Sequence, residues 1–538
     1  MGFSVQAQTT EEWEDDRKID DKEIIIEKDK KIELQIQNKN YEKIPQLIPT
    51  DKYQVSPYSL NSYSMTYSPV NPGIRVLKIK DEALNKLYGN YIKAGYGNYG
   101  TPLLEAFVSN KRNEEYVVGG RFSHFSSSKG PVNDKNSASG MTEAGVFAKA
   151  FTDNATIGGK LDFSNRVNYF YGYNPAVEVN KDSTKQKFNT LGINLSIEGN
   201  KPKNPLQYSL NTSFYNLNDN FDASESLLGF DFNGNYELSE SSAILLETSL
   251  DLSTYKDQGT QKRNVFRINP MYKFQRNNIL FKAGLNIAFE NDTLSGKDDL
   301  HLYPMVEATF PLEGDFNLTA GIRGDIDRVN YRDITEENPW INTQVPLLHT
   351  NRKFDLYGRI KGKISNSLDF SVGVSIAELE NFYVFINDPS DSSRFIPVYD
   401  QGSSSRTLVD AEIAYEYRDL FYIRGKAEIM NYDMDELAEP WHLPNLRFNL
   451  SGGYNIYDKI LLEAELITLT GINALDPVDF STVKLDGIAD LNIKGEYFIS
   501  ERASIFLNFY NLFSKEYERY LNYPSRGLMF VGGVSYSF

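Results

Sequence analysis

Apolar and polar positions alternate strictly at the C-terminal end of the chain. In residues 528–538 every second residue is apolar or small, and the residues between them become more polar toward the end. Successive side chains of a β-strand point to opposite faces, so this pattern predicts a strand with one apolar face. Residues 503–510 alternate in the same way. The two segments therefore predict an antiparallel pair that ends the chain.

This alternation recurs from about residue 88 to the end without a helical interruption. Short polar turns, such as residues 366–367 and 418–419, alternate strictly with long connections, such as residues 330–353 and 381–405. Short turns on one side and long loops on the other are typical of outer-membrane barrels, whose short turns are periplasmic. The pattern predicts an all-β fold, an antiparallel transmembrane β-barrel of about 22 strands over residues 87–538.

The strand count leaves one hairpin open, at residues 382–399 or at the first turn near Gly100. An even number of strands returns both termini to one side, and the last short turn makes that side the periplasm. We therefore predict a protein of the cell outer membrane, embedded in its lipid, with both termini periplasmic. The alternative, the last hairpin of a soluble β-sandwich, does not explain the repetition. We interpret four residues as the signal that closes the barrel: Phe530, Val534, Tyr536 and Phe538.

Charged residues mark the inner face of the predicted wall. In residues 409–417 and 421–429, apolar and polar positions alternate, and the two segments carry charges of opposite sign. A Lys or Arg that faces lipid at the midplane costs roughly 2–4 kcal/mol, so these positions must face the interior. We predict a ladder of solvated lumen charges, rather than a binding site, formed by Glu412, Glu416, Arg424 and Lys426.

The composition agrees with a membrane barrel and argues against other classes of protein. Aromatic residues make up 13% of the chain, which suits the aromatic girdles of a barrel. No apolar run approaches the roughly 20 residues of a spanning helix. The net charge of -17 argues against a nucleic-acid partner. With no cysteine, four scattered histidines and no G-x-S-x-G motif, we predict no catalytic, cofactor or metal site, and no enzyme.

The N-terminal part of the chain has a different texture. Residues 1–8 resemble the end of a secretory signal. Residues 9–86 are first dense in charge and then rich in proline, which predicts a partly extended periplasmic extension with little core of its own. This extension is either a tethered tail or a carrier of a β-strand that docks on the sheet edge of a partner. The candidate docking strand consists of Glu23, Ile24, Ile25 and Ile26.

Short motifs near the C-terminus resemble the end of TonB-dependent receptors. They are Asn511-Leu512-Phe513, Lys515-Glu516-Tyr517, Arg526-Gly527 and the closing Tyr536-Ser537-Phe538, with Ser514 in place of the usual Asp. Residues 74–77, 87–99 and 110–114 are similar to TonB-receptor-like barrels of Bacteroidota that lack a plug domain. The resemblance implies an outer-membrane barrel, and it makes Glu23, Ile24, Ile25 and Ile26 similar to a TonB box.

The resemblance leaves two functions open. Residues 9–86 are too short and too rich in proline to form the plug of a TonB-dependent receptor, and so wide a barrel without a plug would be a large hole. We therefore favour a barrel subunit or scaffold of an outer-membrane complex, with a periplasmic or surface lipoprotein as partner. The alternative is a transporter or channel that passes a solute or polypeptide through the lumen.

Overall fold

The computed structural model describes residues 89–110, 113–199, 204–291 and 299–538. The contacts divide the chain into two units, Met1–Ala83 and Leu84–Phe538. The predicted signal remnant at residues 1–8, the extension at residues 9–86 and its candidate docking strand (Glu23, Ile24, Ile25 and Ile26) lie outside the described residues. All that follows concerns the second unit.

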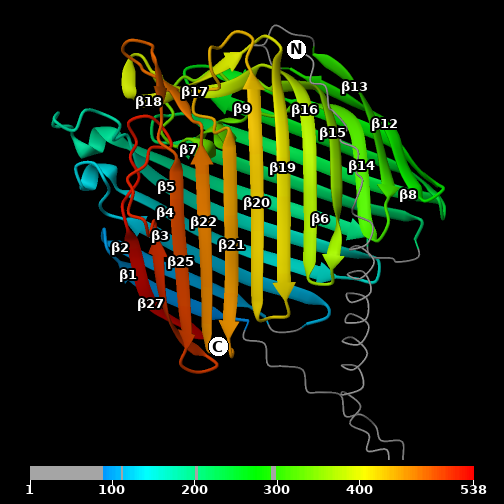
Figure 1. The fold of residues 1–538 in the computed structure, drawn as a ribbon, viewed down its shortest axis with the longest axis horizontal. Coiled ribbons are helices and arrows are strands. Elements are labelled where there is room, and N and C mark those ends of the chain that lie inside the picture. Colours follow the sequence, from blue (N-terminus) through cyan, green and yellow to red (C-terminus); the bar gives the residue numbers. More distant parts are fainter. Residues whose placement is uncertain (1–88, 111–112, 200–203, 292–298) are drawn as a thin grey trace, which may run out of the picture. The chain divides into compact units, whose positions relative to one another are not determined.

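One antiparallel sheet forms the second unit (Figure 1). It has 23 strands, but the three-residue β10 (Thr260–Lys262) pairs only with β9, which leaves 22 strands in the wall. The wall strands, in order around the barrel, are β1 (Tyr91–Gly97), β2 (Thr101–Ser109), β3 (Tyr116–Ser127), β4 (Ser139–Phe151), β5 (Ala155–Tyr169), β6 (Lys185–Gly199), β7 (Leu206–Asp219), β8 (Ser224–Ser239), β9 (Ser242–Lys256), β11 (Val265–Arg276), β12 (Ile279–Glu290), β13 (Leu300–Pro311), β14 (Asp315–Asp327), β15 (Thr350–Ser365), β16 (Leu368–Glu380), β19 (Ser404–Tyr417), β20 (Phe421–Asp433), β21 (Leu446–Ile456), β22 (Ile460–Thr470), β25 (Ile488–Phe498), β26 (Ala503–Tyr510) and β27 (Met529–Ser537). The predicted fold class is confirmed.

The first and last strands pair and close the sheet into a barrel. Tyr91 pairs with Ser537, and the register continues to Gly97 opposite Val531. Closure removes the unpaired strand edge that lipid does not tolerate. Gly533 permits the close approach of the two strands, because a Cβ there would lie 2.0 Å from the carbonyl oxygen of Ala94.

The long connections carry small elements that do not belong to the wall. β17 (Phe382–Asp388) and β18 (Asp391–Asp400) form a two-stranded sheet apart from the wall, as do β23 (Asn473–Leu475) and β24 (Thr482–Lys484). The hairpin that the sequence left open is therefore a loop hairpin. The connections also hold two short 3-10 helices (Lys135–Ser137 and Lys181–Thr184) and the helix α2 (Tyr331–Glu337). No helix in the described part of the chain is long and apolar enough to cross a membrane.

Short turns and long loops lie at opposite ends of the barrel (Figure 1). We call them the short-turn end and the long-loop end. Residues 366–367 and 418–420 form short turns, whereas residues 328–349 and 381–403 form long loops. Phe538 donates its backbone N–H to the carbonyl of Asn90 over 2.9 Å, so the two ends of the wall meet at the short-turn end.

The two faces of the wall follow the alternation of the sequence. On β19, Val409 and Ile413 keep 41% and 48% of their surface exposed, as do apolar side chains at matching positions all round the outer face. An exposed apolar belt on a closed barrel is the surface that lipid covers. The opposite face of the same strands carries charged and polar side chains, and it forms the wall of the candidate site.

Candidate functional site

Several loops of the long-loop end share a hydrophobic core, which we call the loop core. It draws on wall strands, on the β14–β15 loop, on the β17–β18 hairpin and on the β26–β27 loop. Its buried members are Phe188, Tyr215, Leu217, Ala223, Leu227, Tyr255, Val329, Tyr331, Ile334, Ile341, Val345, Leu347, Phe385, Phe395, Tyr520 and Tyr523. Burying such side chains contributes roughly 1.5–3 kcal/mol each, so the loops form a packed structure.

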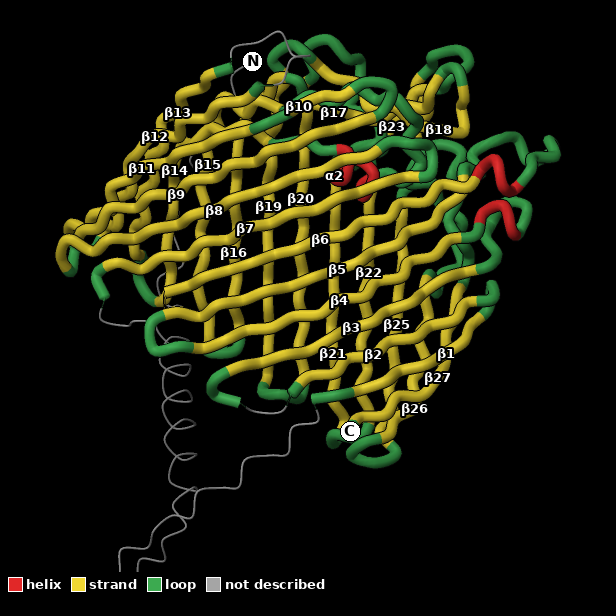
Figure 2. The backbone as a smooth tube through the Cα atoms, turned by 180° about the vertical axis from the view of Figure 1, so that it is seen from behind, coloured by secondary structure: helices red, strands yellow, loops and turns green. Residues whose placement is uncertain are grey.

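Residues 328–349, which we call the strap, run through the middle of the loop core. The strap joins β14 to β15 and contains α2, which lies within the outline of the barrel toward its long-loop end (Figure 2). The hydroxyl of Tyr331 donates to Asp219 at the end of β7 over 2.9 Å, and the indole N–H of Trp340 donates to the carbonyl of Tyr169 over 3.0 Å. These bonds connect the strap to β5 and β7, which are far along the sheet from β14 and β15, the strands that the strap joins.

The other side of the strap contacts the hairpin and the last loop. Ile341 forms a parallel β-bridge with Phe395 of β18. The hydroxyl of Tyr520 donates to the carbonyl of Glu337 over 3.1 Å, and the Trp340 ring lies 4.1 Å from the Tyr523 ring, centroid to centroid. The strap therefore bridges opposite stretches of the wall and covers the lumen at this end.

A buried histidine joins the hairpin to the last loop. His442, in the β20–β21 loop, is 1% exposed. Its Nδ1 lies 2.8 Å from the carbonyl oxygen of Phe385 and its Nε2 accepts the backbone N–H of Leu521 over 3.2 Å. Nδ1 therefore carries the proton of a neutral ring. Burial lowers the pKa of His442 to about 4 and outweighs the hydrogen bond to Phe385.

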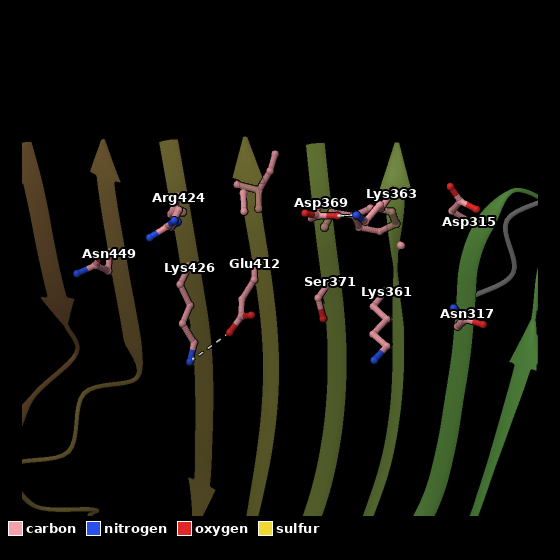
Figure 3. A pocket seen from close by; sticks show the side chains of 15 residues that line it. Asp315, Asn317, Lys361, Lys363, Asp369, Ser371, Glu412, Arg424, Lys426 and Asn449 are labelled. Carbon is pink, nitrogen blue, oxygen red and sulfur yellow. Dashed lines mark ion pairs between the residues drawn. The ribbon is translucent and has the colours of Figure 1, made fainter. Parts of the chain in front are cut away.

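Near the short turns the inner face is exposed, and we call this part of the lumen the vestibule. A row of Cα partners runs across six neighbouring strands, and its members share one face because partners on an antiparallel ladder point the same way. The row is Asn317, Lys361, Ser371, Glu412, Lys426 and Asn449. The row lines a cavity of about 520 Å³ (Figure 3).

The inner face of β20 links the vestibule to the loops. Lys426, Met430 and Tyr432 share this face by their even spacing. Tyr432 stacks on Phe382 of the hairpin, with ring centroids 5.5 Å apart. A single face thus passes from solvent near the short turns to the β17–β18 hairpin at the other end.

The four predicted lumen charges lie together on β19 and β20. Nζ of Lys426 is 3.4 Å from a carboxylate oxygen of Glu412, and the two point toward each other in Figure 3. The Arg424 guanidinium is 4.0 Å from Glu416, and both side chains are more than half exposed, at 60% and 68%. Such exposed pairs contribute roughly 0–1 kcal/mol.

The predicted closing residues lie at the seam of the barrel. Phe530, Val534 and Tyr536 share the outer face of β27, at 43%, 59% and 49% exposure, and Phe538 follows the strand at 39%. β27 pairs with both β26 and β1. Whether these residues act as a signal stays a prediction.

Sequence reasoning missed the strap and the loop core. The signal was present, because the strap holds Tyr331, Ile334, Trp340, Ile341 and Leu347 in a segment that a water-facing loop would keep polar. Alternation cannot find such residues, since the strap is not a strand. In the described residues, no group of three or more potential ligands is placed to hold a metal ion.

Comparisons with known proteins bear on the fold. No family model and no curated protein matches the chain. Among solved structures, the chain resembles the FrpB iron transporter from Neisseria meningitidis, with a TM-score of 0.65, 10% identity, and coverage of 85% of this chain and 82% of that one. It also resembles the siderophore receptor PirA from Acinetobacter baumannii (TM-score 0.63, 11% identity, coverage 84% and 80%) and the ferric-catecholate import receptor Fiu from E. coli K12 (0.62, 10%, 84% and 82%).

At these identities the likeness concerns the fold. It agrees with the closed wall, the apolar outer belt and the division into a short-turn end and a long-loop end. The chain is thus a β-barrel of the outer membrane with the fold of TonB-dependent receptors.

Proposed function

We propose that the protein is a gated outer-membrane transporter, in which the strap and the loop core form the gate of the lumen. The carrying observation is the contrast along one inner face, which is buried under the loops at one end and exposed in the vestibule at the other. The solved structures with this fold include an iron transporter and siderophore receptors. The cargo is a solute or a polypeptide that passes when the strap moves, as lids do in many proteins.

The scaffold function remains a second candidate, and the size of the loop core favours it. A core of sixteen buried side chains also suits a permanent seal, with the barrel serving as a platform for a lipoprotein partner. In both cases we propose that the short-turn end and both termini face the periplasm, and that the barrel is of the plugless Bacteroidota type. The two functions differ in whether the gate ever opens.

A cysteine pair that locks the gate separates the two functions. Ile341 and Phe395 are bridge partners, and the Cα atoms of such partners lie within the range that a disulfide spans. The chain has no other cysteine, so Ile341→Cys with Phe395→Cys forms one defined crosslink. A transporter should lose its ability to rescue a deletion strain when oxidised and regain it when a reductant is added.

The controls are the two single cysteine variants, which carry the same loss of core volume without the crosslink. A locked double variant that rescues the strain as well as its reduced form would reject the transporter and favour the scaffold. Labelling tags in residues 330–353 and at Asp458 on intact cells tests the orientation. The loop tag should react and the Asp458 tag should not.

A further inference from the structure

A buried carboxylate on the wall holds the start of the strap. Glu225, the second residue of β8, is 0% exposed. Its carboxylate accepts the backbone N–H groups of Tyr331 and Arg332, each over 3.0 Å, and the hydroxyl of Tyr215 over 2.8 Å. The first N–H groups of a helix have no partner within the helix. Glu225 therefore satisfies the first turn of α2 from outside the strap.

A buried guanidinium in the connection between β9 and β11 holds both ends of the strap. Arg263, between β10 and β11, is 1% exposed. Its Nη1 donates to the carbonyl of Val329 over 2.5 Å and its Nη2 donates to Nδ1 of His349 over 3.0 Å. Val329 is the second residue of the strap and His349 is its last. One side chain thus joins the two points where the strap leaves and re-enters the wall.

His349 accepts hydrogen bonds in this arrangement, which we call the clamp and which consists of Glu225, Arg263 and His349. Nδ1 of His349 also receives the backbone N–H of Val329 over 3.2 Å, so the neutral ring carries its proton on Nε2. Burial, together with the positive charge of Arg263, holds the pKa of His349 well below its usual value. Val329 is clamped by Arg263, and Tyr331, two residues on, is held by Glu225. Two side chains of opposite charge, from β8 and from the β9–β11 connection, thus hold neighbouring residues of the strap.

We propose that Glu225 and Arg263 are the positioning residues that hold the gate shut. The inference rests on the proposed function, since it assigns to these two residues the closing of that gate. Three donors converge on Glu225, and a glutamine offers one acceptor oxygen and an NH₂ group in its place. At least one donor then loses its partner, and the negative charge of Glu225, with which Arg263 interacts electrostatically, is removed. Leaving a buried donor without its acceptor is destabilising.

The proposal separates the gate from the wall. The backbone ladder that closes the barrel does not pass through either side chain, because the bonds that Glu225 and Arg263 make to the strap are side-chain bonds. Their loss should therefore free the strap while the barrel stays inserted. Substitution of a residue needed only for folding of the barrel would instead abolish gate closure and barrel insertion together.

The test uses a single reporter cysteine in the full-length protein on intact cells. Ser371→Cys places a thiol in the vestibule, and a PEG-maleimide added outside reaches it only through the long-loop end. In the parent the cysteine should be protected. Glu225→Gln and Arg263→Lys should each raise the labelling rate at least about tenfold (a shift of about 1.4 kcal/mol in the gate equilibrium), with unchanged resistance of the barrel to SDS without heating.

Three controls make the result decisive. Glu247→Gln removes the same charge from the exposed inner face of β9 and should leave the reporter protected. Glu225→Asp, which keeps the carboxylate, should be labelled more slowly than Glu225→Gln. It also provides the measurement at this position if Glu225→Gln fails to insert. Replacing residues 331–347 by a Gly-Ser linker should expose the reporter fully.

Two outcomes overturn the proposal in different ways. If the linker variant is labelled while Glu225→Gln and Arg263→Lys behave like the parent, the strap is the gate but these two residues do not hold it. If the linker variant is itself protected, the strap is not the barrier, and the proposed function fails together with this inference.

Discussion

The long-loop end and the short-turn end of the barrel are built from the same strands, yet their inner faces have different surroundings. Near its start β8 carries Glu225 and Leu227, at 0% and 2% exposure, and it ends in exposed residues at its short turn. The strand pattern is unchanged between the two. Burial on the inner face is therefore set by the loops that fold over it and not by the strands.

The same contrast governs the charges. Near the loops, Asp251 is 8% exposed and lies 3.5 Å from Arg267, itself 14% exposed. Near the short turns, Lys363 and Asp369 are 57% and 58% exposed and 3.9 Å apart. Exposed pairs are screened by water and salt, whereas a buried charge that loses its partner has nothing to replace it. The two ends should thus respond very differently to similar substitutions.

The largest effect should come from truncating the loop core. Phe395 is 0% exposed and contacts the rings of His442, Tyr520 and Tyr523. Phe395→Ala should destabilise the loops by about 3–5 kcal/mol. Thermal melting followed by tryptophan fluorescence measures this, because Trp340 lies in the strap.

The matched control is Tyr457→Ala, at a short turn where the side chain is 90% exposed. It should leave the melting curve unchanged. Equal shifts for the two variants would mean that the loops are not a packed unit.

Next in size is the loss of a buried charge. Asp251 contacts both Arg267 and Arg328, the latter at 2.5 Å, so Asp251→Asn should cost about 3–5 kcal/mol. Glu412→Gln, in the half-exposed pair with Lys426, should cost about 0–1 kcal/mol. Urea unfolding of the refolded barrel in detergent compares the two. Similar costs would contradict the contrast between the ends.

A smaller effect should separate lipid from water at the short-turn end. Ile413 and the side chain of Glu412 are almost equally exposed, at 48% and 50%, but they lie on opposite faces of β19. Ile413→Lys should weaken insertion by at most about 2–4 kcal/mol, the cost at the bilayer midplane, while Glu412→Lys should not. The fraction that resists SDS before heating reports insertion, and equal tolerance would mean that the faces are reversed.

A further effect should be a loss of loop stability in acid, which grows as the pH falls. Because the pKa of His442 in the folded protein is lowered to about 4, the unfolded loops bind the proton more tightly than the folded ones. The stability from neutral His442 is therefore complete above the usual histidine value of about 6.5 and falls as the pH drops toward 4. Tryptophan melting at several pH values measures it.

In His442→Asn this part of the pH dependence should disappear, although the loops start from a lower stability. The comparison isolates His442 from the carboxylates, which titrate over a similar range. If loop stability in His442→Asn changes with pH as steeply as in the parent, His442 is not responsible for the pH dependence.

Much of the wall could be predicted from the sequence, because a strand carries its facing in a period of two residues. Ile413 beside Glu412 shows which side meets lipid, and the short turn at residues 366–367 shows where the chain reverses. The hairpin at residues 382–399 could not be placed, since β17 and β18 alternate like wall strands but pair with each other and not with the wall. A local pattern does not reveal which strand is the partner.

The candidate site lay almost wholly beyond such reasoning. Glu225, Arg263 and His349 are far apart in the chain and belong to no motif. The four predicted charges, from Glu412 to Lys426, lie at the exposed end of the lumen, because regular alternation is clearest where loops do not interfere. Where a wall residue faces a folded loop, its type depends on its contacts with that loop and follows no sequence period.

What the sequence determined by itself is the wall: strands that alternate, turns that alternate in length, and an even count that closes. These follow from local physics, since each strand must show one face to lipid and hydrogen-bond to both neighbours. What only the tertiary structure decided is how the lumen is covered. The strap, with Glu225 and Arg263 that hold it, depends on contacts between distant segments, and such contacts exist only after the barrel has brought those segments to the same end.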